Sequence, residues 1–98
     1  MASYSIILAD DHALVRWGLR RLIEDMDELE VVGEANDGIE LLQLLKHVTP
    51  QMVILDIFMP NLRGIEAISE IKAMHPDMKI LILTMHRPSC VTSDSIDV

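Results

Sequence analysis

Three aspartates lie where two apolar segments of the chain end. Asp10 and Asp11 directly follow the apolar run at 5–9. Asp56 closes the apolar run at 52–55. If both runs are parallel strands of one sheet, their carboxyl ends meet at the same edge and bring the three carboxylates together. Like charges held this close repel and raise each other's pKa, so we expect the cluster to bind a hard cation or to do chemistry.

The chemistry that these groups favour is Mg²⁺-assisted phosphoryl transfer. Mg²⁺ needs only one or two carboxylates and a backbone carbonyl, because it retains several water ligands. The carbonyl of Phe58 follows Asp56 closely enough to supply that ligand. A carboxylate beside a bound cation can attack a phosphoryl group, since the cation screens the negative charge of both partners. Thr84 ends a later apolar run, where its hydroxyl could donate to a phosphoryl oxygen.

Each of these residues also has a purely structural interpretation. Asp11 or His12 could cap the helix that follows them. Asp56 could be a turn residue after its strand, and Thr84 fits β-propensity alone. The presence of all these groups at the ends of adjacent strands favours a functional site.

The pattern that must position the site is an alternation of strands and helices. We expect strands at Ser5–Ala9, Glu30–Ala35, Met52–Asp56 and Lys79–Thr84. Helical spacing of apolar residues predicts helices from Asp11 or His12 to about Asp25, from Ile39 to Val48 and from Ile65 to Met74. Short turns between them imply right-handed crossovers around a parallel sheet, an α/β fold.

The first helix carries both an apolar face and a basic cluster. The apolar face is expected to contain Val15, Gly18, Leu19, Leu22 and Ile23. The basic cluster consists of Arg16, Arg20 and Arg21, with Glu24 and Asp25 facing it. This mixture of charges favours a solvated helix face over a phosphate-binding surface.

Composition narrows the class of protein. The 98 residues suffice for one small domain. The net charge of −8 argues against binding to nucleic acid, which needs clustered Lys and Arg. Cys90 is the one cysteine, so no internal disulfide is possible and a reducing cytoplasm is expected. The chain shows no leader sequence and no apolar run of about 18 residues, so we expect no contact with a membrane.

The order of these motifs resembles the receiver domain of bacterial two-component response regulators. The resemblance is carried by Asp10-Asp11, by the stretch 55–60, by Gly64 and by Leu83-Thr84. The stretches 9–19 and 83–86 are similar to the NarL/FixJ-type subgroup in particular.

The resemblance covers about residues 4–86 and implies a flavodoxin-like, doubly wound parallel sheet. About four strands in the order 2-1-3-4 and three helices are expected, so the sheet is incomplete. Residues 1–86 would then form a receiver domain that lacks its last strand and helices. Residues 87–98 would form a polar tail, a loop or a disordered end.

The resemblance also implies a role for each candidate residue. Asp56 matches the phospho-acceptor, which takes its phosphoryl group from a phosphohistidine of a partner histidine kinase. Asp11 matches the direct Mg²⁺ ligand, and Asp10 matches its neighbour, which acts through water. The Phe58 carbonyl matches the backbone ligand, and Thr84 the switch hydroxyl. The implied function is a signalling receiver, not an enzyme, that controls a downstream transcriptional output.

The sequence departs from the receiver pattern after His86. A full receiver continues with a helix, a fifth strand ending in Lys and a last helix, whereas no Lys follows Lys79 here. The fourth strand would become an exposed edge, and one side of the first helix would lose its cover. We therefore expect a homodimer or a swapped oligomer. The alternative function is a truncated receiver that phosphorylates poorly and mainly self-associates.

The chain lacks the motifs of two other functional classes. A phosphatase of the haloacid-dehalogenase type needs Asp-x-Asp at the nucleophile, and Asp56-Ile57-Phe58 lacks it. Dinucleotide binding needs Gly-x-Gly-x-x-Gly after the first strand, and that motif is absent from the chain.

Overall fold

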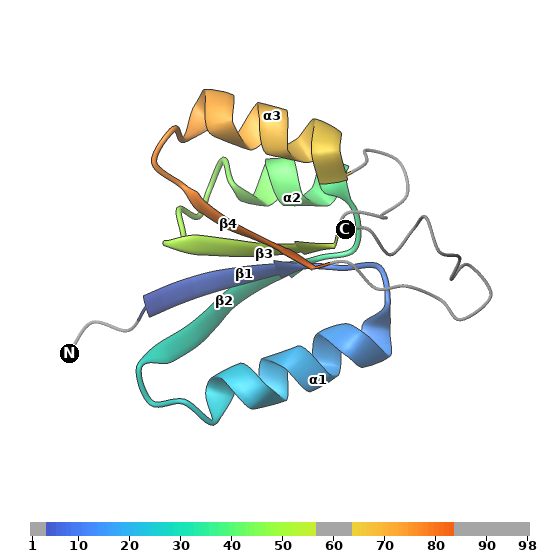
Figure 1. The fold of residues 1–98 in the computed structure, drawn as a ribbon, viewed down its shortest axis with the longest axis vertical. Helices are drawn as coiled ribbons and strands as arrows, with labels where there is room; N and C mark the ends of the chain where they lie inside the picture. Colours follow the sequence, from blue (N-terminus) through green and yellow to red (C-terminus); the bar gives the residue numbers. More distant parts are fainter. Residues whose placement is uncertain (1–3, 57–63, 84–98) are drawn as a thin grey trace, which may run out of the picture.

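A four-stranded parallel sheet forms the centre of the molecule. The computed structural model describes residues 4–56 and 64–83. The strand order is β2-β1-β3-β4, as expected for this α/β fold (Figure 1). The strands are β1 (Tyr4–Ala9), β2 (Leu29–Ala35), β3 (Met52–Asp56) and β4 (Lys79–Leu83).

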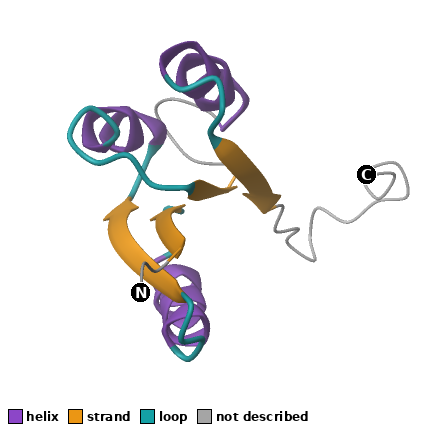
Figure 2. Cartoon of the chain, turned by 90° about the vertical axis from the view of Figure 1, so that its left-hand side faces the viewer, coloured by secondary structure: helices purple, strands orange, loops and turns teal. Residues whose placement is uncertain are grey.

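Helices cover both faces of the sheet. One face carries α1 (Ala13–Glu24), and the other carries α2 (Gly38–Leu44) and α3 (Gly64–Met74) (Figures 1 and 2). This three-layer, doubly wound arrangement confirms the predicted fold class. Within the described part of the chain, no helix has the length and apolar character needed to cross a bilayer.

The continuous apolar runs of β1 and β3 are explained by burial on both faces of the sheet. On the side of α2 and α3, the buried cluster includes Ile7, Val53, Leu55, Leu41 and Ile71. On the side of α1 it consists of Ile6, Leu8, Ile23 and Val31. Successive residues of β1 therefore contribute to opposite clusters, as the alternation of side chains along a strand requires.

The register of the strands brings the predicted site residues to one edge of the sheet. Ala9 of β1 pairs with Leu55 of β3, and Asp56 pairs with Leu83 of β4. The backbone N–H of Asp10 donates to the carbonyl of Ala35 at 3.1 Å, which extends the pairing of β1 with β2 by one residue. The carboxyl ends of all four strands thus lie along one edge.

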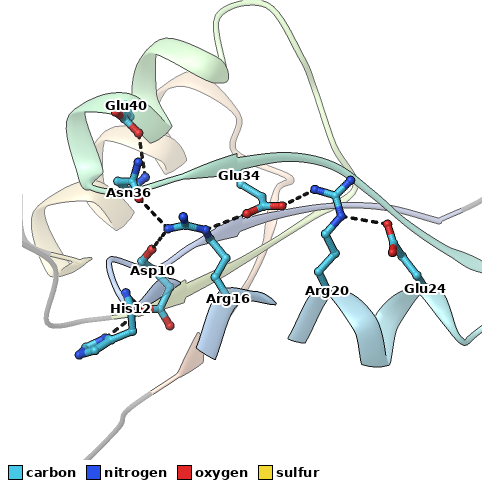
Figure 3. Close-up of polar contacts among 8 residues, drawn as sticks. All are labelled: Asp10, His12, Arg16, Arg20, Glu24, Glu34, Asn36 and Glu40. Carbon is cyan, nitrogen blue, oxygen red and sulfur yellow. Dashed lines mark hydrogen bonds and ion pairs between the residues drawn. The ribbon is translucent and has the colours of Figure 1, made fainter. Parts of the chain in front are cut away.

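Ion pairs that share the Glu34 carboxylate hold α1 against β2 (Figure 3). The Arg16 Nε donates to Glu34 Oε1 at 2.7 Å, and an amino group of Arg20 donates to the other carboxylate oxygen of Glu34. Arg20 also pairs with Glu24 at 2.9 Å. The prediction of a solvated basic face is wrong for Arg16, whose side chain is 15% exposed because it packs against Glu34 of the neighbouring strand. It holds in part for Arg20, which is 41% exposed and pairs with Glu24 as expected, although it also contacts Glu34. Arg21 instead lies over the ring of Trp17, 5.2 Å from its centroid.

The second helix begins at Gly38, one residue before the predicted Ile39, and ends earlier than predicted. Asp37 caps it by accepting a hydrogen bond from the backbone N–H of Glu40 at 2.8 Å. The predicted end at Val48 is wrong, since α2 ends at Leu44. The N–H groups of Lys46 and His47 donate to carbonyls three residues back, which is the hydrogen-bond pattern of a 3₁₀ turn rather than of an α-helix.

Among the described residues, none covers one side of α1. Ile23 is buried and Leu19 packs beside it, but Leu22 is 61% exposed, so its predicted burial is wrong. The reason is that α1 packs against β1 and β2, which cover only the side of the helix that faces them. Leu14 and Trp17 are exposed as well.

The fourth strand lies at the edge of the described sheet and is also poorly covered. Among the described strands, β4 pairs with β3 alone. Leu81 is 50% exposed, and Ile82 is exposed as well. A groove of about 580 Å³ runs between α1 and the end of β4, lined by Trp17, Leu22 and Leu83 among others.

The Glu34 network makes a contribution to stability that depends on pH. Burial acts to raise the pKa of Glu34, but hydrogen bonds from Arg20 and Arg16 outweigh it and lower the pKa below 4.5. Because this pKa is lower in the folded than in the unfolded chain, the stabilisation is present above pH 4.5 and is lost as the pH falls below it.

We expect Glu34→Gln to lower the free energy of unfolding by about 1–2 kcal/mol at neutral pH. The difference from the unmodified chain should shrink as the pH falls below 4.5, where Glu34 becomes protonated. Urea unfolding at a series of pH values measures both effects. Glu30→Gln, an exposed change on the same strand, is the matched control. A loss of stability that stays constant across this range would contradict the assignment.

Candidate metal centre at the sheet edge

Four potential ligand groups converge at the carboxyl edge of β1 and β3. They belong to Asp10, Asp11, His12 and Asp56, and their ligand atoms all lie within 4.8 Å of one another. Asp56 is the last residue of β3, whereas the other three form the link from β1 to α1. The structure thus brings together the three aspartates on which the sequence analysis depends.

Two of the carboxylates are withdrawn from solvent. Asp10 is 2% exposed and Asp56 is 1% exposed, and they are the buried charged residues of the described chain. One oxygen of Asp10, Oδ2, has no hydrogen-bond partner among the described residues. A buried carboxylate oxygen without a partner carries a desolvation cost that a bound cation would offset.

His12 is a member of the cluster that the sequence analysis missed. It is the N-cap residue of α1, but its side chain makes no capping hydrogen bond. Its Nδ1 instead lies 3.1 Å from Oδ1 of Asp10, 3.1 Å from Oδ1 of Asp11 and 3.6 Å from Oδ2 of Asp56. The hydrogen bond with Asp10 raises the pKa of His12 above 6.5, and the nearby charges act in the same direction against a smaller effect of burial.

The backbone around Asp10 is held by Arg16, which the sequence analysis also missed. An Arg16 amino group donates both to the backbone carbonyl of Asp10 and to Oδ1 of Asn36, the latter at 2.7 Å (Figure 3). The spacing of Arg16 could have indicated this role, because Arg16 lies four residues after His12, about one helical turn farther along the chain. Arg16 therefore positions the site without belonging to the cluster.

Two further candidate residues, Phe58 and Thr84, lie outside the described residues. Their predicted roles as a backbone ligand and as a switch hydroxyl therefore stay predictions. The adjacent described residues are Leu83 and Asp56, which pair directly across β4 and β3.

The donor set of the cluster fits a hard divalent cation. Carboxylate oxygens come from two neighbouring strand ends, and one oxygen of the buried Asp10 carboxylate has no hydrogen-bond partner among the described residues. Mg²⁺ accepts such oxygens together with several waters. The residues that would hold the ion are Asp10, Asp11 and Asp56.

Comparison with known proteins gives the family. The profile of the response regulator receiver domain matches residues 6–98. The chain is 42% identical over 81 residues to the uncharacterized transcriptional regulatory protein YhcZ of Bacillus subtilis (strain 168), covering 83% of this chain and 38% of that protein. It is 39% identical over 82 residues to the response regulator UvrY of Escherichia coli (strain K12), covering 84% and 38%. The chain thus spans less than two fifths of these curated relatives.

The solved structures agree with this relationship. The signal receiver domain of the response regulator NarL from Mycobacterium tuberculosis superposes with a TM-score of 0.81 at 28% identity, covering 93% of this chain and 74% of that chain. This similarity is consistent with the NarL/FixJ-type subgroup indicated by the sequence. The family profile extends past His86, while the expected division between 1–86 and 87–98 stays a prediction because residues 84–98 are not described. The chain belongs to the response regulator receiver domain family of two-component signalling systems.

Proposed function

We propose that this chain accepts a phosphoryl group on Asp56 from the phosphohistidine of a partner histidine kinase. The observation that carries the proposal is the position of Asp56 at the end of β3, within 4.8 Å of ligand atoms of Asp10 and Asp11. The kinase partner and a transcriptional output are carried over from the family and from the names of the relatives. A kinase of this kind works in the cytoplasm, where we expect this chain to act.

The reaction requires Asp56 to act as a nucleophile. One carboxylate oxygen attacks phosphorus, the P–N bond to the donor imidazole breaks, and the imidazole nitrogen leaves with the bonding electrons and is protonated. Asp56 is consumed once per phosphoryl group, so the chain serves as a phospho-acceptor rather than as an enzyme with turnover. Its burial restricts water, which would otherwise hydrolyse the acyl phosphate.

Asp10 and Asp11 would hold Mg²⁺ beside Asp56, together with the Phe58 carbonyl. When bound, the ion neutralises the cluster and the charge of the incoming phosphoryl oxygens. Arg16 holds the Asp10 backbone, so that the carboxylate stays at the edge of β1. Thr84 would supply a hydroxyl that turns toward the phosphoryl group, as the resemblance implies.

A second candidate function is self-association. Leu14, Trp17 and Leu22 on α1 and Leu81 on β4 are at least half exposed, although large apolar side chains of this kind are usually buried. An edge strand offers unpaired N–H and C=O groups on which a second copy could extend the sheet. We propose a homodimer through this surface.

Phosphorylation should depend on Asp56. With Mg²⁺ and a small acyl phosphate as donor, intact-protein mass spectrometry should show a gain of about 80 Da, the mass of one phosphoryl group. Asp56→Asn should show no gain, while the matched control Asp27→Asn, an exposed change in the α1–β2 turn, should behave like the unmodified chain. Addition of EDTA should prevent the gain. An unmodified chain that gains no mass would contradict the proposal, as would Asp56→Asn gaining as much as the unmodified chain.

Binding of Mg²⁺ should stabilise the fold. At Mg²⁺ concentrations well above Kd, we expect the melting temperature to rise by several degrees, equivalent to roughly 1–3 kcal/mol. Asp10→Asn should lose most of this shift, and without Mg²⁺ it should be at least as stable as the unmodified chain because one like charge is gone. Differential scanning calorimetry measures both effects. Equal Mg²⁺ shifts in the two proteins would show that the ion binds elsewhere.

Self-association is tested by light scattering on a sizing column. The unmodified chain should elute with twice its monomer mass of 11.1 kDa. The double variant Leu22→Gln, Leu81→Gln should elute as a monomer, because it removes apolar area from both sides of the groove. Ile39→Gln, an equally exposed apolar position on α2, should leave the mass unchanged. A monomeric unmodified chain would exclude the dimer.

A further inference from the structure

The strand β2 contains one residue more than its partner β1. Ile6 of β1 pairs with Val31 of β2. The next residue of β1, Ile7, pairs with Gly33, so Val32 has no counterpart on β1. Val32 packs on the side of α2, and a Cβ added at Gly33 would meet α2 as well. Two successive residues of β2 thus lie on the same side of the sheet, which is the pattern of a β-bulge.

The bulge determines on which face of the sheet Glu34 lies. Glu34 pairs with Leu8, which belongs to the buried cluster on the side of α1. Without the extra residue, Glu34 would pair with Ala9, which belongs to the cluster on the side of α2 and α3. A shift of one residue moves a side chain to the opposite face of a sheet, so the bulge directs the Glu34 carboxylate toward α1. Bulges occur next to active sites, where they redirect a side chain in this way.

The side chain of Arg16 connects Glu34 to the loop that follows β1 (Figure 3). Its Nε donates to Glu34 Oε1 at 2.7 Å. Its Nη1 carries two hydrogens, which serve the backbone carbonyl of Asp10 and Oδ1 of Asn36. Because a guanidinium group is planar and rigid, an acceptor that holds Nε also sets the direction of the amino groups. Glu34 therefore orients the donor that Asp10 receives.

The peptide group between Asp10 and Asp11 is held through its carbonyl. The backbone N–H of Asp10 donates to the carbonyl of Ala35 at 3.1 Å, and its carbonyl accepts from Arg16. Two successive residues of β2, Glu34 and Ala35, thus hold Asp10 from both ends, one directly and one through Arg16. A rotation of this peptide group would move the carboxylates of Asp10 and Asp11 relative to Asp56.

We propose that Glu34 is a positioning residue of the phospho-acceptor site and that it acts through Arg16 on the peptide group between Asp10 and Asp11. Arg20 provides an internal comparison. It pairs with the same Glu34 carboxylate, but its other hydrogen bond stays within α1. This inference rests on the proposed function, because it assigns a positioning residue to the same site.

A double-mutant cycle on the rate of phosphorylation tests the proposal. With Mg²⁺ and a small acyl phosphate at saturating concentrations, Arg16→Gln should slow the mass gain about tenfold, as misplacement of a reacting group does. Glu34→Gln should also slow it, and should have no further effect in the Arg16→Gln background. Arg20→Gln is the matched control, since it removes an ion pair with the same carboxylate, and its rate should equal that of the unmodified chain.

Nuclear magnetic resonance supplies a readout that needs no phosphoryl donor. A triple-resonance spectrum correlates the amide of Asp11 with the carbonyl carbon of Asp10, and this carbon reports the hydrogen bond from Arg16. Its signal should shift in Arg16→Gln and in Glu34→Gln and should stay in place in Arg20→Gln.

A conservative variant separates positioning from stability. Arg16→Lys retains a positive charge opposite Glu34, but one ammonium group cannot reproduce the two arms of the guanidinium. It should therefore fold, as circular dichroism would establish, and still shift the Asp10 carbonyl signal and slow phosphorylation. If Arg16→Gln does not fold, Arg16→Lys takes its place in the cycle.

The outcomes separate this inference from the proposed function. Equal slowing by Arg16→Gln and Arg20→Gln would show that the ion pairs act through stability alone, and would overturn the proposal. Independent effects of Glu34→Gln and Arg16→Gln, or an Asp10 carbonyl signal unchanged in both, would overturn it as well. If the unmodified chain takes up no phosphoryl group, the proposed function fails, and the carbonyl signal alone then decides whether Glu34 positions this peptide group.

Discussion

The parallel pairing of β1 with β3 is the constraint on which the rest of the structure depends. Ala9 pairs with Leu55, so the residues that come next, Asp10 and Asp56, lie at the same edge of the sheet. Asp10 and Asp56 are therefore buried side by side, although two like charges in a low dielectric repel. A bound cation would offset this repulsion, and the imidazole of His12 lies 3.1 Å from an Asp10 oxygen and 3.6 Å from an Asp56 oxygen.

The contacts of Arg16 link the stability of the fold to the geometry of the site. Arg16 joins Glu34 on β2, the carbonyl of Asp10 after β1 and the side chain of Asn36. It thus ties α1 to the sheet and at the same time fixes the backbone that carries the first carboxylates. The acidic cluster and the docking of α1 are therefore connected by one polar network, visible in Figure 3.

Much of the fold was predictable because its signals are local. Apolar runs predicted the strands within one residue at each described end, and their terminal aspartates predicted where the carboxylates would gather. The errors concern side chains whose surroundings depend on tertiary structure. Whether Leu22 is covered depends on which strands α1 crosses, and the partner of Arg16 lies on β2, 18 residues away. His12 was missed because its side-chain direction follows from the path of the chain into α1.

We propose that one divalent ion binds between the strand ends of β1 and β3. Anomalous diffraction from crystals grown with Mn²⁺ tests it most directly. We expect a single strong peak about 2 Å from carboxylate oxygens of the aspartates at the ends of both strands. An anomalous peak at any other place, or no peak between Asp11 and Asp56, would contradict it.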